Sequence, residues 1–159
     1  MKLKLNPEFR NRHLFVAVLM LGLACWFGYD GFVGYPRASA HDLYVKIEAA
    51  EPDPQADLEA FKAQKIKTQY GFTLLAFAAS AAVALHLLAV ARLDFSFDEG
   101  GFTCAGERHA FADIASVDDA LWKSKGIMRI TFGGRTVTLD AWHHLGVREF
   151  RAAAGSFVV

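Results

Sequence analysis

The positions of charged residues divide the chain into two long apolar stretches and a mixed C-terminal part. Residues 14–29 and 68–91 carry no charged side chain, and both stretches are apolar on all helical faces rather than along one stripe. A membrane-spanning helix needs about 20 apolar residues to cross about 30 Å of hydrocarbon. The second stretch meets this length, and the first meets it when Asp30 is hydrated among the lipid headgroups. The pattern therefore predicts transmembrane helices at residues 14–34 and 68–91.

The first apolar stretch also has features of a secretory signal sequence. Residues 38–40 (Ala-Ser-Ala) form a small-x-small pattern of the kind that is cleaved. The segment between this pattern and the apolar run, residues 28–37, is long, aromatic and contains glycine and proline, whereas a short polar stretch is typical before a cleavage site. Basic residues precede the stretch, as they do in a signal sequence; they are Lys2, Lys4, Arg10 and Arg12. An uncleaved anchor is the interpretation we favour.

The distribution of basic residues predicts the orientation of the two spans. Residues 1–13 carry four Lys or Arg in a short tail, whereas five are spread over residues 30–67 beside seven Asp or Glu. Cytoplasmic segments near membrane spans are enriched in Lys and Arg. We therefore expect a multi-pass protein of the bacterial inner (cytoplasmic) membrane, with residues 1–13 and 92–159 cytoplasmic and the loop 35–67 outside.

The predicted external segment contains signals for a turn and for two helices. Residues 30–36 hold two glycines and a proline, which predict a turn, and residues 41–50 are amphipathic enough for a short helix. Asp53 followed by Pro54 is typical of a helix start. A helix beginning there would run directly into the second span.

Beyond Arg92 the pattern changes to short pieces in which apolar and polar residues alternate. Residues 93–97 alternate with period two, as a half-buried strand does, and Gly133-Gly134 predicts a two-residue hairpin. Residues 122–126 are expected to form a loop, and residues 144–154 an amphipathic helix. Further strands are expected at residues 102–104, 108–111, 114–117, 127–132 and 135–139. The predicted fold is a two-helix transmembrane hairpin followed by a small α+β domain at residues 92–159.

Short motifs within this domain are Phe95–Phe102, Phe111–Ile114, Val117-Asp118, Trp122–Gly126 and Leu139-Asp140. Together they resemble the bacterial PH-like domain found in small two-span membrane proteins, some of which also have a stretch like Tyr29–Pro36. The resemblance covers about residues 93–152 and implies a PH-like antiparallel β roll capped by a C-terminal helix. It implies no catalytic residues.

Composition excludes several classes of protein. Lys+Arg and Asp+Glu are equal at 17 each, whereas a nucleic-acid binder would be strongly basic. Cys25 lies in the first apolar run and Cys104 in the distal domain, so they form neither a disulfide framework nor a zinc site. The sequence contains none of the common hydrolase, metalloprotease, nucleotide or dinucleotide motifs. We therefore expect no enzymatic activity, no metal site and no cofactor.

Two sets of residues could still carry a binding function. Lys123, Lys125, Arg129 and Arg135 could meet anionic lipid headgroups, each contributing about 1 kcal/mol near such a surface. The domain totals eight Lys or Arg against nine Asp or Glu, so a mixed solvated face is the competing interpretation.

The second set consists of histidines. His13 and His86 each lie near the predicted cytoplasmic end of a span, where two imidazoles could ligate a haem iron. A single helix pair makes a thin haem pocket. His143 and His144 are adjacent and diverge on a helix or a strand, so they do not form a metal site by themselves.

By elimination, the architecture predicts a non-enzymatic accessory or scaffold subunit of a bacterial membrane assembly, with the PH-like module making protein contacts. The alternatives are a module that senses anionic lipid and a small haem-binding membrane protein. The expected partners are the lipid bilayer and other membrane proteins or a second copy of the chain, and not nucleic acid.

Overall fold

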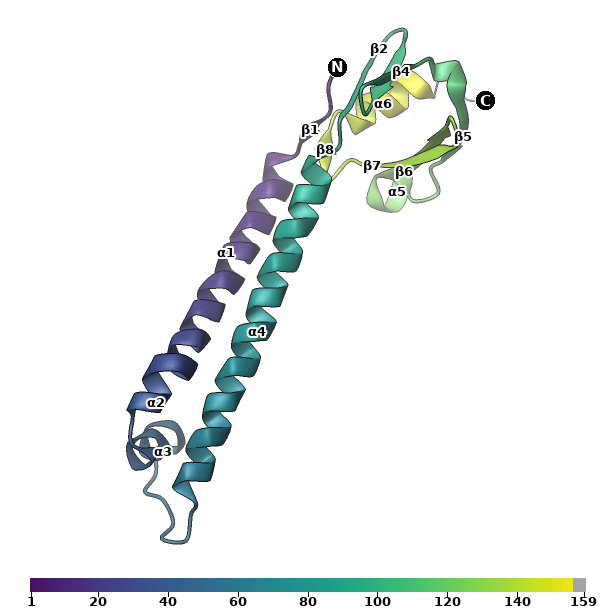
Figure 1. The fold of residues 1–159 in the computed structure, drawn as a ribbon. Coiled ribbons are helices and arrows are strands. Elements are labelled where there is room, and N and C mark those ends of the chain that lie inside the picture. Colours follow the sequence, from purple (N-terminus) through teal and green to yellow (C-terminus); the bar gives the residue numbers. More distant parts are fainter. Residues whose placement is uncertain (156–159) are drawn as a thin grey trace. The chain divides into compact units, whose positions relative to one another are not determined.

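The computed structural model describes residues 1–155 and divides the chain into two compact units (Figure 1). The helical unit comprises His13–Leu85. The β unit comprises Met1–Arg12 together with the chain from His86 onward. Two long helices followed by antiparallel sheets confirm the predicted order of a helical part and a small β-containing domain.

Two long helices make up most of the helical unit. Helix α1 (Pro7–Tyr29) continues through the π-helix η1 (Asp30–Gly34) into α2 (Tyr35–Arg37), so residues 7–37 form one continuous helix. Helix α4 (Leu58–Ala91) has 34 residues. Both are long and apolar enough to cross a membrane, and large apolar side chains on them are exposed, such as Phe15 at 68% and Leu74 at 71%.

The predicted turn at residues 30–36 is wrong, because the chain stays helical there. The Tyr35 amide donates to the carbonyl of Asp30, which keeps the backbone bonded through the wider π turn. Gly31 serves close packing instead of a turn, since a Cβ on it would lie 2.9 Å from Cδ1 of Tyr70. A glycine in a sequence is compatible with a turn or with close packing, and Gly31 is used for close packing between helices.

The connection between the long helices begins with α3 (Ala40–Glu48), which confirms the short helix expected near residues 41–50. Its N-cap is Ser39, whose hydroxyl accepts from the Asp42 amide at 3.0 Å. The helix start predicted at Asp53 is wrong, because Asp53 caps a turn. The cap of α4 is Asp57, whose carboxylate accepts from the Ala60 amide at 3.0 Å. As expected, α4 then runs without a break into the second apolar stretch.

Small side chains lie where the two long helices pack within the helical unit. Ala24 and Ala76 are buried, and Ser80 is 8% exposed. The Ser80 hydroxyl donates to the Ala17 carbonyl at 2.8 Å. Such contacts let helix backbones approach closely in an apolar medium.

In the described part of the chain, the β unit contains two three-stranded antiparallel sheets, in which the strands follow chain order, and one two-stranded antiparallel pair. Gly133-Gly134 makes the predicted hairpin, and a short helix α5 (Trp122–Lys125) replaces the predicted loop. The 3-10 helix η2 (Phe111–Asp113) joins the sheets, so the strand expected to reach Phe111 ends at His109. The first sheet contains β2 (Phe95–Asp98), β3 (Gly101–Cys104) and β4 (Glu107–His109); the second contains β5 (Ile114–Asp118), β6 (Ile127–Phe132) and β7 (Arg135–Asp140).

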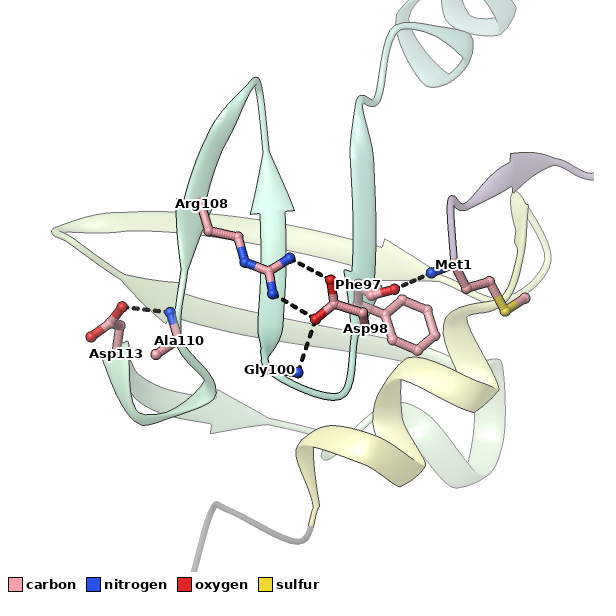
Figure 2. A network of polar contacts seen from close by, with 7 residues as sticks. All are labelled: Met1, Phe97, Asp98, Gly100, Arg108, Ala110 and Asp113. Carbon is pink, nitrogen blue, oxygen red and sulfur yellow. Dashed lines mark hydrogen bonds and ion pairs between the residues drawn. The ribbon is translucent and has the colours of Figure 1, made fainter.

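A polar network fixes the first sheet at the turn between β2 and β3 (Figure 2). The guanidinium of Arg108 donates to both carboxylate oxygens of Asp98, at 2.7 and 2.5 Å, and the Gly100 amide donates to the same group at 2.9 Å. These bonds, that from Arg108 first, hold the pKa of Asp98 at about 2. Next to it, Gly101 must be glycine, since its φ is +145° and a Cβ would lie 2.2 Å from the His109 carbonyl oxygen.

Helix α6 (Val147–Ala154) closes the β unit, as predicted, but begins three residues later than expected. His144–Leu145 form the strand β8, which pairs with β1 (Lys4–Leu5). The helix expected at residues 144–154 would have included Leu145, but Leu145 lies on this strand and is 48% exposed.

Phenylalanine rings from several elements form the core of the β unit. Phe150 on α6 is fully buried, with its ring centroid 4.9 Å from that of Phe95 and 5.5 Å from that of Phe97. Phe102 is also fully buried and lies 4.8 Å from Phe132. The other buried members of this core are Leu3, Phe111, Ile114, Met128, Ile130, Leu139, Val147 and Ala154.

The N-terminal residues belong to this core, which the sequence pattern did not indicate. Leu3 is 4% exposed, and its amide donates to the Phe95 carbonyl at 2.9 Å. The N-terminal amine of Met1 donates to the Phe97 carbonyl (Figure 2). A Cβ on Gly146 would lie 2.9 Å from the side chains of Met1 and Leu3, so this glycine makes room for them.

Candidate functional site

The most distinctive polar feature of the β unit is a pocket of about 500 Å³ beside the short helix α5. It is lined by the residues of α5 and its cap, by Ala141 and Trp142 from the turn after β7, and by Arg148 of α6. We call it the basic pocket. The lining residues are Trp122, Lys123, Ser124, Lys125, Gly126, Ala141, Trp142 and Arg148.

Local backbone geometry places α5 against the turn that follows β7. Gly126 ends α5 in the left-handed conformation, with φ at +71°. Its carbonyl accepts from the Ala141 amide at 3.0 Å, and a Cβ on it would lie 3.3 Å from Cβ of Ala141. Trp122 packs partly against the core and anchors the other end of α5. These contacts bring two tryptophans that are distant in sequence into one pocket.

The lining of the basic pocket has three cationic side chains and no carboxylate. Lys123, Lys125 and Arg148 are exposed and form no ion pair with any residue of the described part of the chain, 1–155. Unpaired cations beside an open, partly apolar hollow suit an anionic group, which would gain charge-assisted hydrogen bonds there.

Two other basic side chains of the β unit pair with acids. Arg151 pairs with Asp119 at 2.7 Å, and its guanidinium lies 5.0 Å from the Trp122 ring centroid. Arg108 pairs with Asp98 at 2.5 Å. Arg151 and Arg108 therefore differ from the three cations of the basic pocket, which have no ion-pair partner in the described chain.

The four lysines and arginines that the sequence suggested for lipid binding lie in two different environments. Lys123 and Lys125 both line the basic pocket. Arg129 instead lies 3.6 Å from the carboxylate of Asp118, and Arg135 lies 3.1 Å from that of Glu107.

Sequence reasoning missed two members of the pocket. Arg148 lies on the polar face of α6, where it resembles any solvated charge, and only the fold brings it near α5. Trp142 follows β7 and is 39% exposed, an unusual exposure for a tryptophan that only the fold reveals.

The basic pocket lies beside Arg12, the last Lys or Arg before the first apolar run. The guanidinium of Arg12 is 5.4 Å from the ring centroid of Trp142, and the Asn6 amide side chain donates to the Trp142 carbonyl at 2.9 Å. Residues 14–29 carry no charge. A tryptophan at such a position is typical of the interface between membrane and water.

Histidines and aromatic rings form a second cluster in the β unit. The ring centroid of His143 lies 4.4 Å from that of Phe9 and 5.8 Å from that of His86. His144 is 5% exposed, and its Nε2 lies 3.1 Å from the Val90 carbonyl oxygen, so it donates there. Burial lowers the pKa of His144, which favours the neutral ring. This cluster ties the ends of α1 and α4 to the turn before α6.

The positions of these histidines do not test the haem hypothesis. His13 belongs to the helical unit and His86 to the β unit, so their pairing stays a prediction. In residues 1–155, no group of three or more His, Cys, Asp or Glu is placed to hold a metal ion.

Comparison with protein-family models, with curated proteins and with solved structures finds no match for this chain. The interpretation of the basic pocket therefore rests on its own geometry.

Proposed function

We propose that this chain is a non-enzymatic, membrane-anchored module whose PH-like domain binds the headgroup of an anionic phospholipid in the basic pocket. The observation that carries the proposal is the set of unpaired cations, Lys123, Lys125 and Arg148, gathered beside two tryptophans without any carboxylate in the lining. The two apolar helices would supply the anchor.

The PH-like assignment draws support from the element order. Two three-stranded antiparallel sheets followed by a closing helix agree with the roll that the sequence motifs imply. We propose the cytoplasmic side of a bacterial inner membrane for this domain, because the N-terminal basic residues favour that side. Anionic lipids on that surface would supply the ligand.

The accessory or scaffold role predicted from the sequence stays a prediction. It rests on elimination, whereas the basic pocket offers a specific arrangement of charge. Lipid binding is therefore the function that the geometry favours.

A pair of matched double variants tests the proposal. The full chain carrying Trp26→Phe, so that only Trp122 and Trp142 report, is titrated in uncharged detergent micelles with short-chain phosphatidylglycerol while tryptophan emission is followed. Lys123→Gln/Lys125→Gln should weaken binding about 30-fold, because two cations contribute about 1 kcal/mol each near an anionic surface. Binding should also weaken as salt is raised, since exposed charges are screened beyond about 8–10 Å.

The control removes the same charge from elsewhere on the domain. Arg129→Gln/Arg135→Gln loses two cations that already pair with Asp118 and Glu107, so its affinity should stay within about threefold of the parent. Equal weakening in the two double variants would mean that net charge alone attracts the lipid, and the basic pocket would then have no special role.

A further inference from the structure

The end of the first long helix carries a second pocket, in the helical unit, whose chemistry differs from that of the basic pocket. A hollow of about 520 Å³ is lined by Trp26, Tyr29, Asp30, Tyr35 and Lys46. This aromatic pocket lies at the end of the first apolar stretch, where the chain would leave the hydrocarbon. It is independent of the proposed function, because it shares no residue with the basic pocket.

The π-helix η1 brings the aromatic residues together. In a regular α-helix, at about 100° per residue, Tyr35 would lie on the side opposite Trp26. A π turn holds about one extra residue, which rotates the following helix back by about 100° and returns Tyr35 toward the face of Trp26 and Asp30. Tyr35 is held there by Gln69, whose side-chain amide donates to its hydroxyl at 3.1 Å.

Asp30 is half-buried among these rings. Its carboxylate accepts from the indole N–H of Trp26 at 3.1 Å. Gly34 leaves room for the carboxylate, since a Cβ there would lie 3.2 Å from Oδ1 of Asp30. Within residues 1–155, Asp30 forms no ion pair.

The charges around the aromatic pocket suit a ligand that carries both signs. A cation is attracted to the faces of Trp and Tyr, and aromatic cages recognise ammonium groups in this way. The carboxylate of Asp30 adds a negative charge to such a cage. Lys46 is exposed on α3, has no ion-pair partner in the described chain, and supplies one positive charge at the same hollow.

We propose that the aromatic pocket binds the zwitterionic headgroup of a phospholipid, with the ammonium group among Trp26, Tyr29, Tyr35 and Asp30 and the phosphate at Lys46. An interfacial band of aromatic side chains needs no carboxylate and no π turn. The aromatic pocket has both, and each places a group where the ammonium would lie. A carboxylate at the end of a span can be hydrated among the headgroups, and the ammonium group would give Asp30 a cationic partner there.

The test compares lipids that share a phosphate and differ in the ammonium group. The full chain carrying Trp122→Phe and Trp142→Phe leaves Trp26 as the reporter in uncharged detergent micelles. It is titrated with short-chain phosphatidylcholine and with phosphatidylglycerol of the same acyl chains. We expect a saturable change in Trp26 emission with phosphatidylcholine, at an affinity at least tenfold higher than for phosphatidylglycerol.

Substitutions then assign the two charges. Asp30→Asn keeps an acceptor for the Trp26 indole but removes the charge, so it should weaken phosphatidylcholine binding about tenfold and leave phosphatidylglycerol unchanged. Lys46→Gln should weaken both lipids, because both carry the phosphate. Glu59→Gln, an exposed acid in the first turn of α4, serves as the control and should change neither.

Two results would overturn the proposal. The first is an equal response to the two lipids, which would mean that the aromatic side chains sense the bilayer surface in general. The second is phosphatidylcholine affinity unchanged by Asp30→Asn. If Asp30→Asn lowers the helix content in circular dichroism, Tyr29→Leu replaces it, since Tyr29 is 61% exposed. That variant should weaken phosphatidylcholine binding selectively, and its failure to do so counts against the proposal equally.

Discussion

At the scale of single residues, His144 makes the β unit sensitive to acid. Its ring is 5% exposed and donates from Nε2 to the Val90 carbonyl at 3.1 Å, while its Nδ1 is buried without a hydrogen-bond partner in the described chain. Burial lowers its pKa; His143 acts in the same direction, and the bond to Val90 and the charge of Asp140 oppose it. The His144 ring is therefore neutral in the folded state and binds a proton more readily in the unfolded state.

The sign of the resulting pH dependence follows from linkage. An unfolded histidine has a pKa of about 6.5, so above that pH both states are neutral and the full stability is present. As the pH falls from about 6.5 toward the lower folded pKa, the unfolded state binds more protons and stability is lost. Thermal unfolding of the full chain between pH 7.5 and 5 should show this decline, and His144→Gln should flatten it. A slope unchanged by His144→Gln would assign the decline to another group.

At the scale of elements, α6 stabilises the β unit through one face. Phe150 is fully buried among rings of the first sheet, whereas Glu149 beside it is exposed. Truncating a buried phenylalanine to alanine costs about 3–5 kcal/mol, a large part of the stability of a small domain. Phe150→Ala should unfold or strongly destabilise the β unit, and Glu149→Ala should be nearly neutral in thermal unfolding. Similar shifts for both variants would show that α6 does not close the core.

Arg151, on the other side of Phe150, is a poorer control than Glu149. Its guanidinium pairs with Asp119 and lies over the Trp122 ring, so Arg151→Ala removes two contacts. Exposed pairs of this kind contribute about 0–1 kcal/mol.

The N-terminal strand is the second element that the β unit needs. Leu3 is 4% exposed in the common core, and the adjacent Lys4 is exposed. Leu3→Ala should lower the stability of the β unit by about 2–5 kcal/mol, whereas Lys4→Ala should change it by less than about 0.5 kcal/mol. Chemical denaturation of the chain carrying Trp26→Phe, followed by the emission of Trp122 and Trp142, measures both. A silent Leu3→Ala would mean that residues 1–5 form a tail, as the sequence suggested.

At the scale of the whole chain, topology in the membrane is the property to test. Single cysteines are introduced at Gln55 and at Ala120 in a background without Cys25 and Cys104. Both positions are exposed and lie outside helices and strands. Because the basic N-terminal residues favour the cytoplasmic side, a membrane-impermeant thiol reagent should label position 55 in intact cells and spare position 120. Labelling at position 120 would reverse the orientation. A mature N-terminus near His41 would show that the first apolar run is a signal sequence.

Much of the fold could be predicted from local patterns. Uncharged runs predicted both long helices, period-two alternation predicted most strands, and Gly133-Gly134 predicted its hairpin. Two of the errors share a cause, because each concerns a residue with two possible uses. Gly31 serves helix packing rather than a turn, and Asp53 caps a turn rather than a helix.

The candidate sites could be predicted only in part. Lys123 and Lys125 are recognisable as basic residues near an aromatic one, but Arg129 and Arg135 look the same in sequence. Ion pairing separates the two sets, and it depends on which carboxylates the sheets bring near. The aromatic pocket likewise requires the π-helix η1, since regular helical spacing would place Tyr35 away from Trp26.

The sequence by itself determined which segments are apolar enough to cross a membrane and which alternate as strands, because helix and strand periodicity are local properties of the chain. Only the tertiary structure decided that Leu3 completes the core, that Arg148 joins the basic pocket, and that Arg129 and Arg135 are neutralised. Each of these depends on contacts between residues far apart along the chain. Such contacts depend on how the faces of the elements pack together, and the local spacing of residues along the chain does not reveal them.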